Sequence, residues 1–169
     1  IYVNMPKFEK ELPTVLTKED INKLRDIIDI SKTTWIRDRL IIEFLYSSGL
    51  RSSELVSLSE LMIDVKEREV RVLGKGNKER ITFFSENAKI WYEKYLHAKK
   101  NEYKNYTPNI VFVNSRGERI TTRSLRRLIS DYAEKAGINK EVSPHVFRHS
   151  FATTLLNNNV DIRYLQELL

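Results

Sequence analysis

The sequence predicts a mainly helical domain that contains one small antiparallel β-sheet. Three observations support this prediction. Apolar residues follow helical periodicity over most of the chain, capping residues precede those segments, and strand-like alternation is confined to residues 61–84. With 169 residues, 41% of them hydrophobic, the chain is long enough to form one well-packed domain.

The composition is that of a basic globular protein. Lysine and arginine number 29 against 23 aspartates and glutamates, which gives a net charge of +6 and suits a polyanionic partner. The sequence has no cysteine, which excludes disulfides and thiolate zinc sites. It has no apolar run of membrane-spanning length and no signal-peptide pattern, so we expect a cytoplasmic location and no membrane partner.

Two segments concentrate the positive charge. Residues 116–127 hold five arginines and one glutamate, and residues 66–80 hold six basic residues and three glutamates. One such run is usually a solvated face. Two such runs, together with the start of a helix at residues 143–148 that is suited to binding phosphate, favour nucleic acid as the partner.

The first helices are predicted from their ends. Residues 1–13 contain two prolines and are expected to be an extended linker from an upstream domain. Thr17 and Asp20 form a capping-box pattern ahead of an apolar stripe, and a second helix is expected over residues 33–48. Gly49 is expected to end that helix in a left-handed conformation.

A short helix is predicted to begin at Arg51. Glu54 follows three residues later and can reach back to the guanidinium of Arg51. An arginine oriented in this way is suited to binding phosphate. The alternative is a surface ion pair that contributes little, and the sequence leaves both interpretations open.

A β-hairpin is predicted around residues 74–78. Val70 and Val72 before the turn, and Ile81 and Phe83 after it, alternate with polar residues. Lys75 lies at the tip between two glycines, which allow close approach to a phosphate, although most hairpin-tip lysines serve only solubility. A short strand over residues 110–113 is expected to join this sheet.

Two further helices are expected in the second half of the chain. The first, over residues 85–103, carries aromatic residues that fit a core better than a base-stacking surface. The second runs from Thr121 or Thr122 to about residue 136. Arg123, Arg126 and Arg127 crowd its first turns, which suits a helix that enters a DNA groove.

The chemistry is predicted at a helix that starts with Ser143 and Pro144, residues suited to the N-cap and first position. His145 and Arg148 project from one side of its first turn, where the helix dipole favours anions. This arrangement can hold a phosphate and move a proton. A metal site at His145 and His149 is not predicted, because no third ligand is near, and His149 is interpreted as a supporting neighbour.

Three motifs in this order, residues 49–55, 74–80 and 143–153, are similar to the catalytic domain of the tyrosine recombinases, the phage lambda integrase family. The similarity continues through residues 161–169, and its pattern most closely resembles the Xer group. The resemblance spans residues 12–169. It implies the tyrosine recombinase catalytic-domain fold, with Arg51, Lys75, His145 and Arg148 converging on one concave basic face.

The resemblance also implies a reaction: site-specific DNA recombination or integration without metal or cofactor. A tyrosine attacks the scissile phosphate of double-stranded DNA and forms a 3′-phosphotyrosyl bond. By motif position, Arg51 and Arg148 hold the phosphate, His145 serves proton transfer, and Lys75 protonates the leaving oxygen. Glu54 and His149 are expected to support these catalytic groups. The residues expected to contact DNA are Arg123, Arg126, Lys78 and Arg80.

The family pattern continues past Leu169 with a histidine or tryptophan and then the nucleophilic tyrosine. Tyr164 lies before those positions and is not expected to be the nucleophile. Residues 14–169 are therefore expected to be a catalytic domain that lacks its C-terminal segment and is inactive alone. We expect a dimeric or tetrameric synapse on DNA. The alternatives are a type IB topoisomerase-like enzyme and a non-enzymatic DNA-binding module.

Overall fold

The computed structural model describes residues 14–159 and residue 161. The predicted linker over residues 1–13, the expected last helix over residues 160–169 and Tyr164 therefore lie outside the described residues, apart from residue 161. The helices are α1 (Lys18–Ile27), α2 (Thr33–Ser48), α3 (Ser52–Val56), η1 (Glu60–Met62), η2 (Lys75–Asn77), α4 (Glu86–Glu102), α5 (Thr122–Lys135) and α6 (Pro144–Asn157). The strands are β1 (Ile63–Asp64), β2 (Glu69–Leu73) and β3 (Glu79–Phe83).

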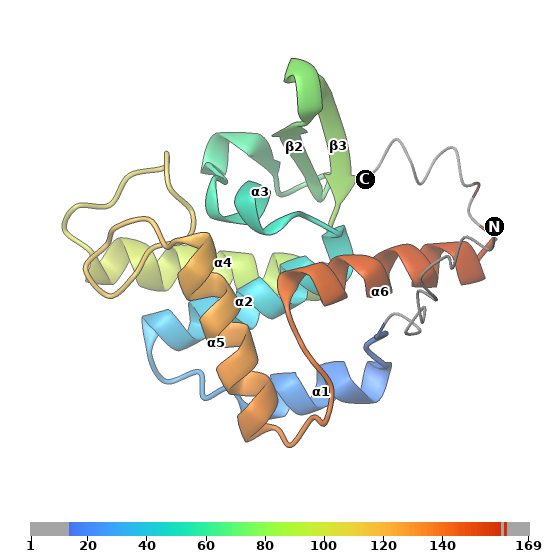
Figure 1. The fold of residues 1–169 in the computed structure, drawn as a ribbon. Helices are drawn as coiled ribbons and strands as arrows, with labels where there is room; N and C mark the ends of the chain where they lie inside the picture. Colours follow the sequence, from blue (N-terminus) through green and yellow to red (C-terminus); the bar gives the residue numbers. More distant parts are fainter. Residues whose placement is uncertain (1–13, 160, 162–169) are drawn as a thin grey trace, which may run out of the picture.

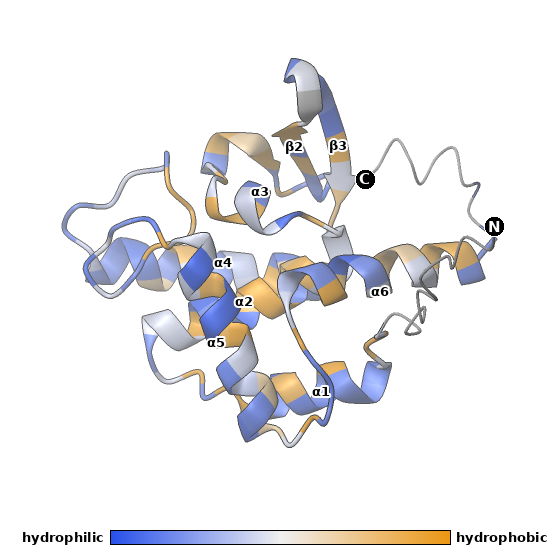
Figure 2. Cartoon of the chain, viewed as in Figure 1, coloured by the Kyte–Doolittle hydropathy of each residue, from blue (hydrophilic) through white to orange (hydrophobic). Residues whose placement is uncertain are grey.

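Helix α2 forms the centre of the domain. It contacts α1, α4, α6 and β3, and Figure 1 shows α1 on one side of it and the sheet projecting on the other. The hydrophobic residues Leu40, Ile41, Ile42, Phe44 and Leu45 are fully buried along it. Figure 2 accordingly shows much of α2 as hydrophobic, whereas α5 alternates between hydrophilic and hydrophobic residues. The fold is thus the mainly helical domain that the sequence predicts.

The predicted helix ends are confirmed. The hydroxyl of Thr17 accepts from the backbone N–H of Asp20 at 3.1 Å, and the Asp20 carboxylate accepts from the N–H of Thr17 at 2.9 Å. Ser143 caps α6 by accepting from the N–H of Val146 at 3.3 Å. Gly49 ends α2 with φ 67°. The two N-caps satisfy backbone N–H groups that the helices themselves leave without partners.

The sheet is antiparallel, in the order β1-β2-β3, and its inner face differs from the hydrophobic pattern of the sequence. Val70 and Val72 are buried as their alternation indicates, but in β3 it is Thr82 that points inward. Thr82 lies opposite Val70 and donates its hydroxyl to the carbonyl of Ser48 at 2.7 Å. Ile81 and Phe83 consequently lie on the exposed face.

The prediction that residues 110–113 form a strand of this sheet is wrong. Val111 and Phe112 are fully buried, but their backbone pairs elsewhere: Val111 donates to Leu58, and Phe112 accepts from Ile120. Only an isolated bridge links Val113 to Arg119. The backbone of the segment is bound by neighbouring loops and by side chains of α4, Tyr95 and Lys99, instead of by a strand. Among the described residues, no helix combines the length and hydrophobicity needed to cross a bilayer.

Candidate active site

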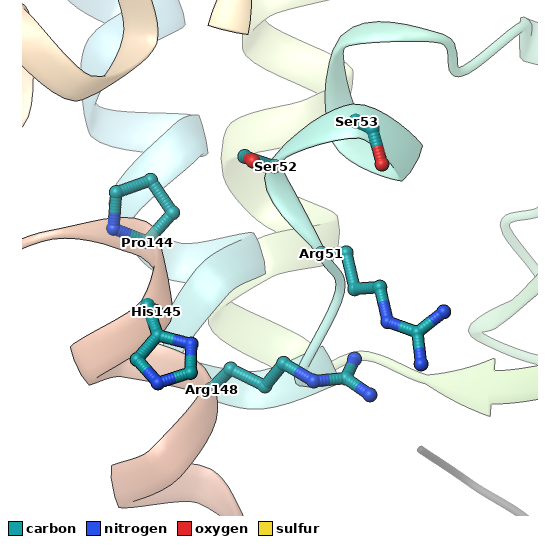
Figure 3. A pocket seen from close by; sticks show the side chains of 6 residues that line it. All are labelled: Arg51, Ser52, Ser53, Pro144, His145 and Arg148. Atoms are coloured by element: carbon teal, nitrogen blue, oxygen red, sulfur yellow. The ribbon is translucent and has the colours of Figure 1, made fainter.

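The first turns of α3 and α6 enclose a cavity of about 360 Å³. It is lined by Arg51, Ser52, Ser53, Pro144, His145 and Arg148. Figure 3 shows the side chains of Arg51 and Arg148 extending to the same side, with the imidazole of His145 next to Arg148. The structure therefore brings together three of the four residues predicted for the reaction, although they lie almost 100 positions apart in the chain.

Arg148 is held in place by the end of α2. Its Nη1 donates to the carbonyl of Gly49 at 2.8 Å, and its side chain is only 15% exposed. Burial lowers the pKa of the Arg148 guanidinium to about 10, and the positive charges of Arg51 and Arg80 act in the same direction. An anion in the cavity would relieve this crowding of positive charge, because it favours the charged form of each arginine.

Glu54 binds differently from the expectation. Its Oε1 accepts from the backbone N–H of Arg51 at 2.8 Å, and its two oxygens together bind the guanidinium of Arg80. Burial raises the pKa of the Glu54 carboxyl, but the hydrogen bonds from Arg80 and from the Arg51 N–H outweigh burial and leave the pKa below its usual value. The sequence could not reveal this partner, because Arg80 lies 26 residues further along the chain.

Lys75 and Lys78, the other two predicted site residues of the hairpin, lie at the tip of that hairpin. Lys75 begins η2. The turn is closed by the N–H of Gly74, which donates to the carbonyl of Lys78 at 2.6 Å. Gly76 has φ 76°, a left-handed conformation that suits glycine. Lys78 is exposed, so its side chain is available for the predicted contact with DNA.

The two histidines of α6 occupy different surroundings. His145 is exposed and lines the cavity, as its position in the first helical turn predicts. His149 lies one turn later and is partly buried, and it is not among the described residues that line the cavity. No group of three histidine, aspartate or glutamate side chains suited to a metal occurs among the described residues.

The arginines of α5 form a second basic surface next to the cavity. Arg123, Arg126 and Arg127 are all exposed and line a hollow of about 540 Å³. Arg126 also lines a hollow of about 350 Å³ that includes His145 and Ser52. Arg126 therefore lies beside the candidate active site, although the sequence places it on a separate helix. The basic surface of α5 continues through it to the cavity.

Sequence reasoning missed two structural supports of this site. Gly49 was predicted as a helix end, but its carbonyl also binds Arg148, and the ring of Phe151 packs against it so closely that a Cβ would lie 2.3 Å from Cδ1. Ser52 and Ser53 add hydroxyl groups to the cavity wall. The position of the two serines in the sequence, directly after Arg51, is the feature that could have indicated their place in the cavity wall.

Comparison with known proteins is consistent with this geometry. Residues 14–169 match the phage integrase family. The chain is 44% identical to tyrosine recombinase XerC of Myxococcus xanthus and 39% identical to tyrosine recombinase XerD of Pseudomonas putida. These alignments cover 99% and 100% of the chain but 57% of each relative, so the chain spans little more than half the length of either.

Solved structures agree with the sequence relatives. The crystal structure of XerA recombinase superposes with a TM-score of 0.82 and 33% identity, covering 93% of this chain and 56% of that one. XerH recombinase, solved bound to its difH substrate, gives a TM-score of 0.79 with 27% identity, covering 95% of this chain and 48% of that one. On its sequence match and its fold, the chain belongs to the phage integrase family, and its relatives include tyrosine recombinases of the Xer type.

Proposed function

We propose that this domain cleaves and rejoins DNA in site-specific recombination, through a 3′-phosphotyrosyl intermediate and without a metal ion. The observation that carries the proposal is the cavity of about 360 Å³ in which Arg51, His145 and Arg148 meet. The cationic side chains that line it suit a phosphate group. The recombinases among its relatives support the reaction class.

In this proposal the two arginines stabilise the transition state. A phosphate attacked by a tyrosine gains negative charge on its non-bridging oxygens. Arg51 and Arg148 supply cationic donors from two elements, and Arg148 is held in place by the Gly49 carbonyl. Fixed donors need no reorganisation during the reaction, which is why they are effective. His145 would donate a hydrogen bond to the same phosphate and take part in proton transfer, because its ring lies at the mouth of the cavity.

The remaining roles rest on the family pattern. Lys75 would protonate the leaving 5′-oxygen from the hairpin tip, and the nucleophile would be a tyrosine beyond Leu169. Glu54 and His149 would support the catalytic groups. The partner would be double-stranded DNA in the cytoplasm, bound by two or four copies of the protein in a synapse. Arg123, Arg126 and Lys78 would contact that DNA outside the reaction centre.

A trapping experiment tests the proposal. A chain that continues through the tyrosine of the family pattern is incubated with a nicked duplex that carries its site, in the presence of a chelator. We expect a covalent protein–DNA adduct that Tyr164→Phe leaves intact. Residues 1–169 alone should bind duplex DNA in a salt-sensitive way, because phosphate contacts release counterions, and should form no adduct.

Other outcomes would identify the alternatives. An adduct formed by residues 1–169 and lost in Tyr164→Phe would make Tyr164 the nucleophile. Relaxation of supercoiled DNA with no joining of two sites would favour a type IB topoisomerase-like enzyme. DNA binding by the longer chain without an adduct would favour a non-enzymatic module, and cleavage that the chelator stops would indicate a nuclease.

Base recognition is assigned to α5 and has its own test. Arg123→Ala should cost about 1–3 kcal/mol of binding free energy and relax the preference for one base pair. Competition between the cognate site and single-base variants measures both effects. An equal loss of affinity on every sequence would instead make Arg123 a phosphate contact.

A further inference from the structure

The pair between Glu54 and Arg80 is enclosed at the junction of three elements. Both guanidinium Nη atoms of Arg80 bind the carboxylate, with the Nη2–Oε1 bond at 2.9 Å. The two side chains are only 10% and 8% exposed. A guanidinium bound to a carboxylate through two donors is fixed in orientation as well as in position. A guanidinium held in this way would have to break both bonds to Glu54 before it could bind a DNA phosphate.

The same carboxylate connects the elements that surround the cavity. Besides Arg80 of β3, Glu54 Oε1 accepts from the backbone N–H of Arg51 at the start of α3. It also lies 3.9 Å from Nη1 of Arg148 on α6. One buried carboxylate therefore faces groups from the hairpin, from α3 and from α6, and its position affects the two arginines that line the cavity.

Arg80 is also the inward-facing side chain of β3 nearest to the turn. It lies opposite the buried Val72 in the register of the hairpin, one residue after the strand begins at Glu79. Lys75 begins the turn only five residues earlier. An anchor at Arg80 therefore restrains the end of the hairpin that carries Lys75, whereas the backbone pairs between β2 and β3 restrain only one strand relative to the other.

Two guanidinium groups, those of Arg80 and Arg148, lie close enough to pair with the Glu54 carboxylate. Arg80 engages both carboxylate oxygens, and Arg148 remains at ion-pair distance while its Nη1 donates to Gly49 instead. Without Arg80, Arg148 would be the nearest guanidinium to a buried carboxylate that requires a partner. A closer pair between Glu54 and Arg148 would draw a cation away from the phosphate site.

We propose that Arg80 is a positioning residue: it anchors the Lys75 hairpin to α3 and keeps the Glu54 carboxylate from capturing Arg148. This inference rests on the proposed function and replaces the expectation that Arg80 contacts DNA. It assigns Arg80 an effect on the rate of strand cleavage at saturating DNA and no direct part in DNA affinity.

The test uses the chain that includes the family tyrosine and two measurements. The first is the single-turnover rate of adduct formation on a nicked duplex at saturating protein. The second is the dependence of DNA affinity on salt. Arg80→Ala should lower the rate about 10²-fold, as a displaced reaction centre does. The salt slope is compared in the double variant Arg80→Ala/Glu54→Gln, in which no carboxylate can capture Arg148: it should equal that of wild type, whereas the loss of a phosphate contact made by Arg80 would reduce the slope by about 1.

Matched variants separate the two parts of the proposal. Arg80→Lys keeps the charge but not the two-donor geometry, so its rate should lie between wild type and Arg80→Ala. The double variant Arg80→Ala/Glu54→Gln removes the carboxylate that would capture Arg148 and should react faster than Arg80→Ala alone. Arg71→Ala removes an arginine from the exposed face of the same hairpin, where its pair with Glu79 spans 4.0 Å, and should keep the wild-type rate.

Several results would overturn the inference. A wild-type rate in Arg80→Ala with a reduced salt slope would make Arg80 a DNA contact. A double variant no faster than Arg80→Ala would refute the protection of Arg148. A wild-type chain that binds DNA without an adduct would contradict the proposed function instead, and the salt slope of the double variant Arg80→Ala/Glu54→Gln would still decide between an anchor and a DNA contact.

Discussion

Two buried glutamates in this domain are each surrounded by arginines, with different consequences. Glu43 on α2 has no exposed side-chain surface and binds Arg25 through two hydrogen bonds of 2.6 and 2.8 Å and Arg39 through one of 3.1 Å. Glu54 on α3 is almost as buried, binds Arg80 through both oxygens, and lies 3.9 Å from Arg148. Both sites hold one carboxylate and several guanidinium groups.

One arginine at each site has a shifted pKa, and the two shifts have opposite directions. The hydrogen bonds that Arg25 donates to Glu43 raise the pKa of the Arg25 guanidinium and outweigh burial, so the cation is stabilised where it lies. The guanidinium of Arg39 also packs over the ring of Trp91 at 4.5 Å. In contrast, burial and neighbouring positive charge lower the pKa of Arg148 to about 10. The first cluster is complete by itself, and the second gains stability when an anion enters.

This difference separates a structural cluster from a functional one. Ion pairs at both sites join distant segments of the chain, so their presence alone does not indicate function. The lowered pKa of Arg148 beside an open cavity does, because perturbed ionisable groups in concave sites are typical of reaction centres. The predictions below alter each cluster in turn.

The largest effect on stability is expected from Glu43→Gln. It leaves two arginines buried without their counter-ion, and removing one partner of a buried pair costs about 3–5 kcal/mol. Urea unfolding measures this loss. Glu19→Gln is the control, because Glu19 pairs with Lys23 at 3.8 Å on the exposed surface, and should cost less than about 1 kcal/mol. Similar losses in both variants would contradict the comparison.

Arg148→Ala should show the opposite behaviour. In the chain with the family tyrosine, the rate of adduct formation should fall on the order of 10²–10³-fold, because a fixed cationic donor is lost. Its free energy of unfolding without DNA should stay within about 1 kcal/mol of wild type, since a crowded cation is removed. Nicked-duplex trapping and urea unfolding of the same preparation give both values. A stability loss as large as that of Glu43→Gln would make Arg148 structural.

Gly49→Ala tests how closely the end of α2 supports Arg148. The new Cβ would lie 2.3 Å from the ring of Phe151, so this ring or α6 as a whole must shift. Gly137→Ala is the matched control: Gly137 has a similar φ of 69°, but nothing lies within 4 Å of its Cβ position. We expect Gly49→Ala to cost about 1–3 kcal/mol more than the control, from overpacking alone. Equal losses in urea unfolding would show that the backbone conformation is the whole effect.

The smallest effect concerns another buried cation, Lys99. Burial lowers the pKa of its amine from 10.5 to about 8, and its Nζ lies 5.0 Å from the ring centre of Tyr106. The unfolded chain then binds more protons between pH 8 and 10.5, so stability should rise with pH from about 8, by at most about 1.4 kcal/mol per unit. The raised pKa of buried tyrosines such as Tyr95 opposes this rise above pH 10.

Lys99→Met should flatten the rise in stability between pH 8 and 9.5. Urea unfolding at half-unit steps of pH is the measurement, and the adduct rate at pH 8 should not change. The result sharpens the comparison, because Lys99 and Arg148 share a lowered pKa but only Arg148 lines the cavity. An altered adduct rate in Lys99→Met would show that a lowered pKa matters for function even away from the site.

The sequence by itself determined the features that depend on neighbouring residues. The capping box of Thr17 and Asp20, the Ser143 cap of α6 and the left-handed end of α2 at Gly49 all follow from interactions within a few positions. The first-turn spacing of His145 and Arg148 is equally local, so the phosphate-suited helix start was predictable. The three motifs that carry the family resemblance are also readable without a structure.

Only the tertiary structure decided which distant residues meet. Arg80 takes the place beside Glu54 that the sequence reading assigned to the guanidinium of Arg51, because strand register turns Arg80 inward along with Thr82. Residues 110–113 have the composition of a strand but lie buried away from the sheet. The physical reason is common to these cases: a local pattern fixes which face of a segment is apolar, whereas the partner of that face depends on how the whole chain packs.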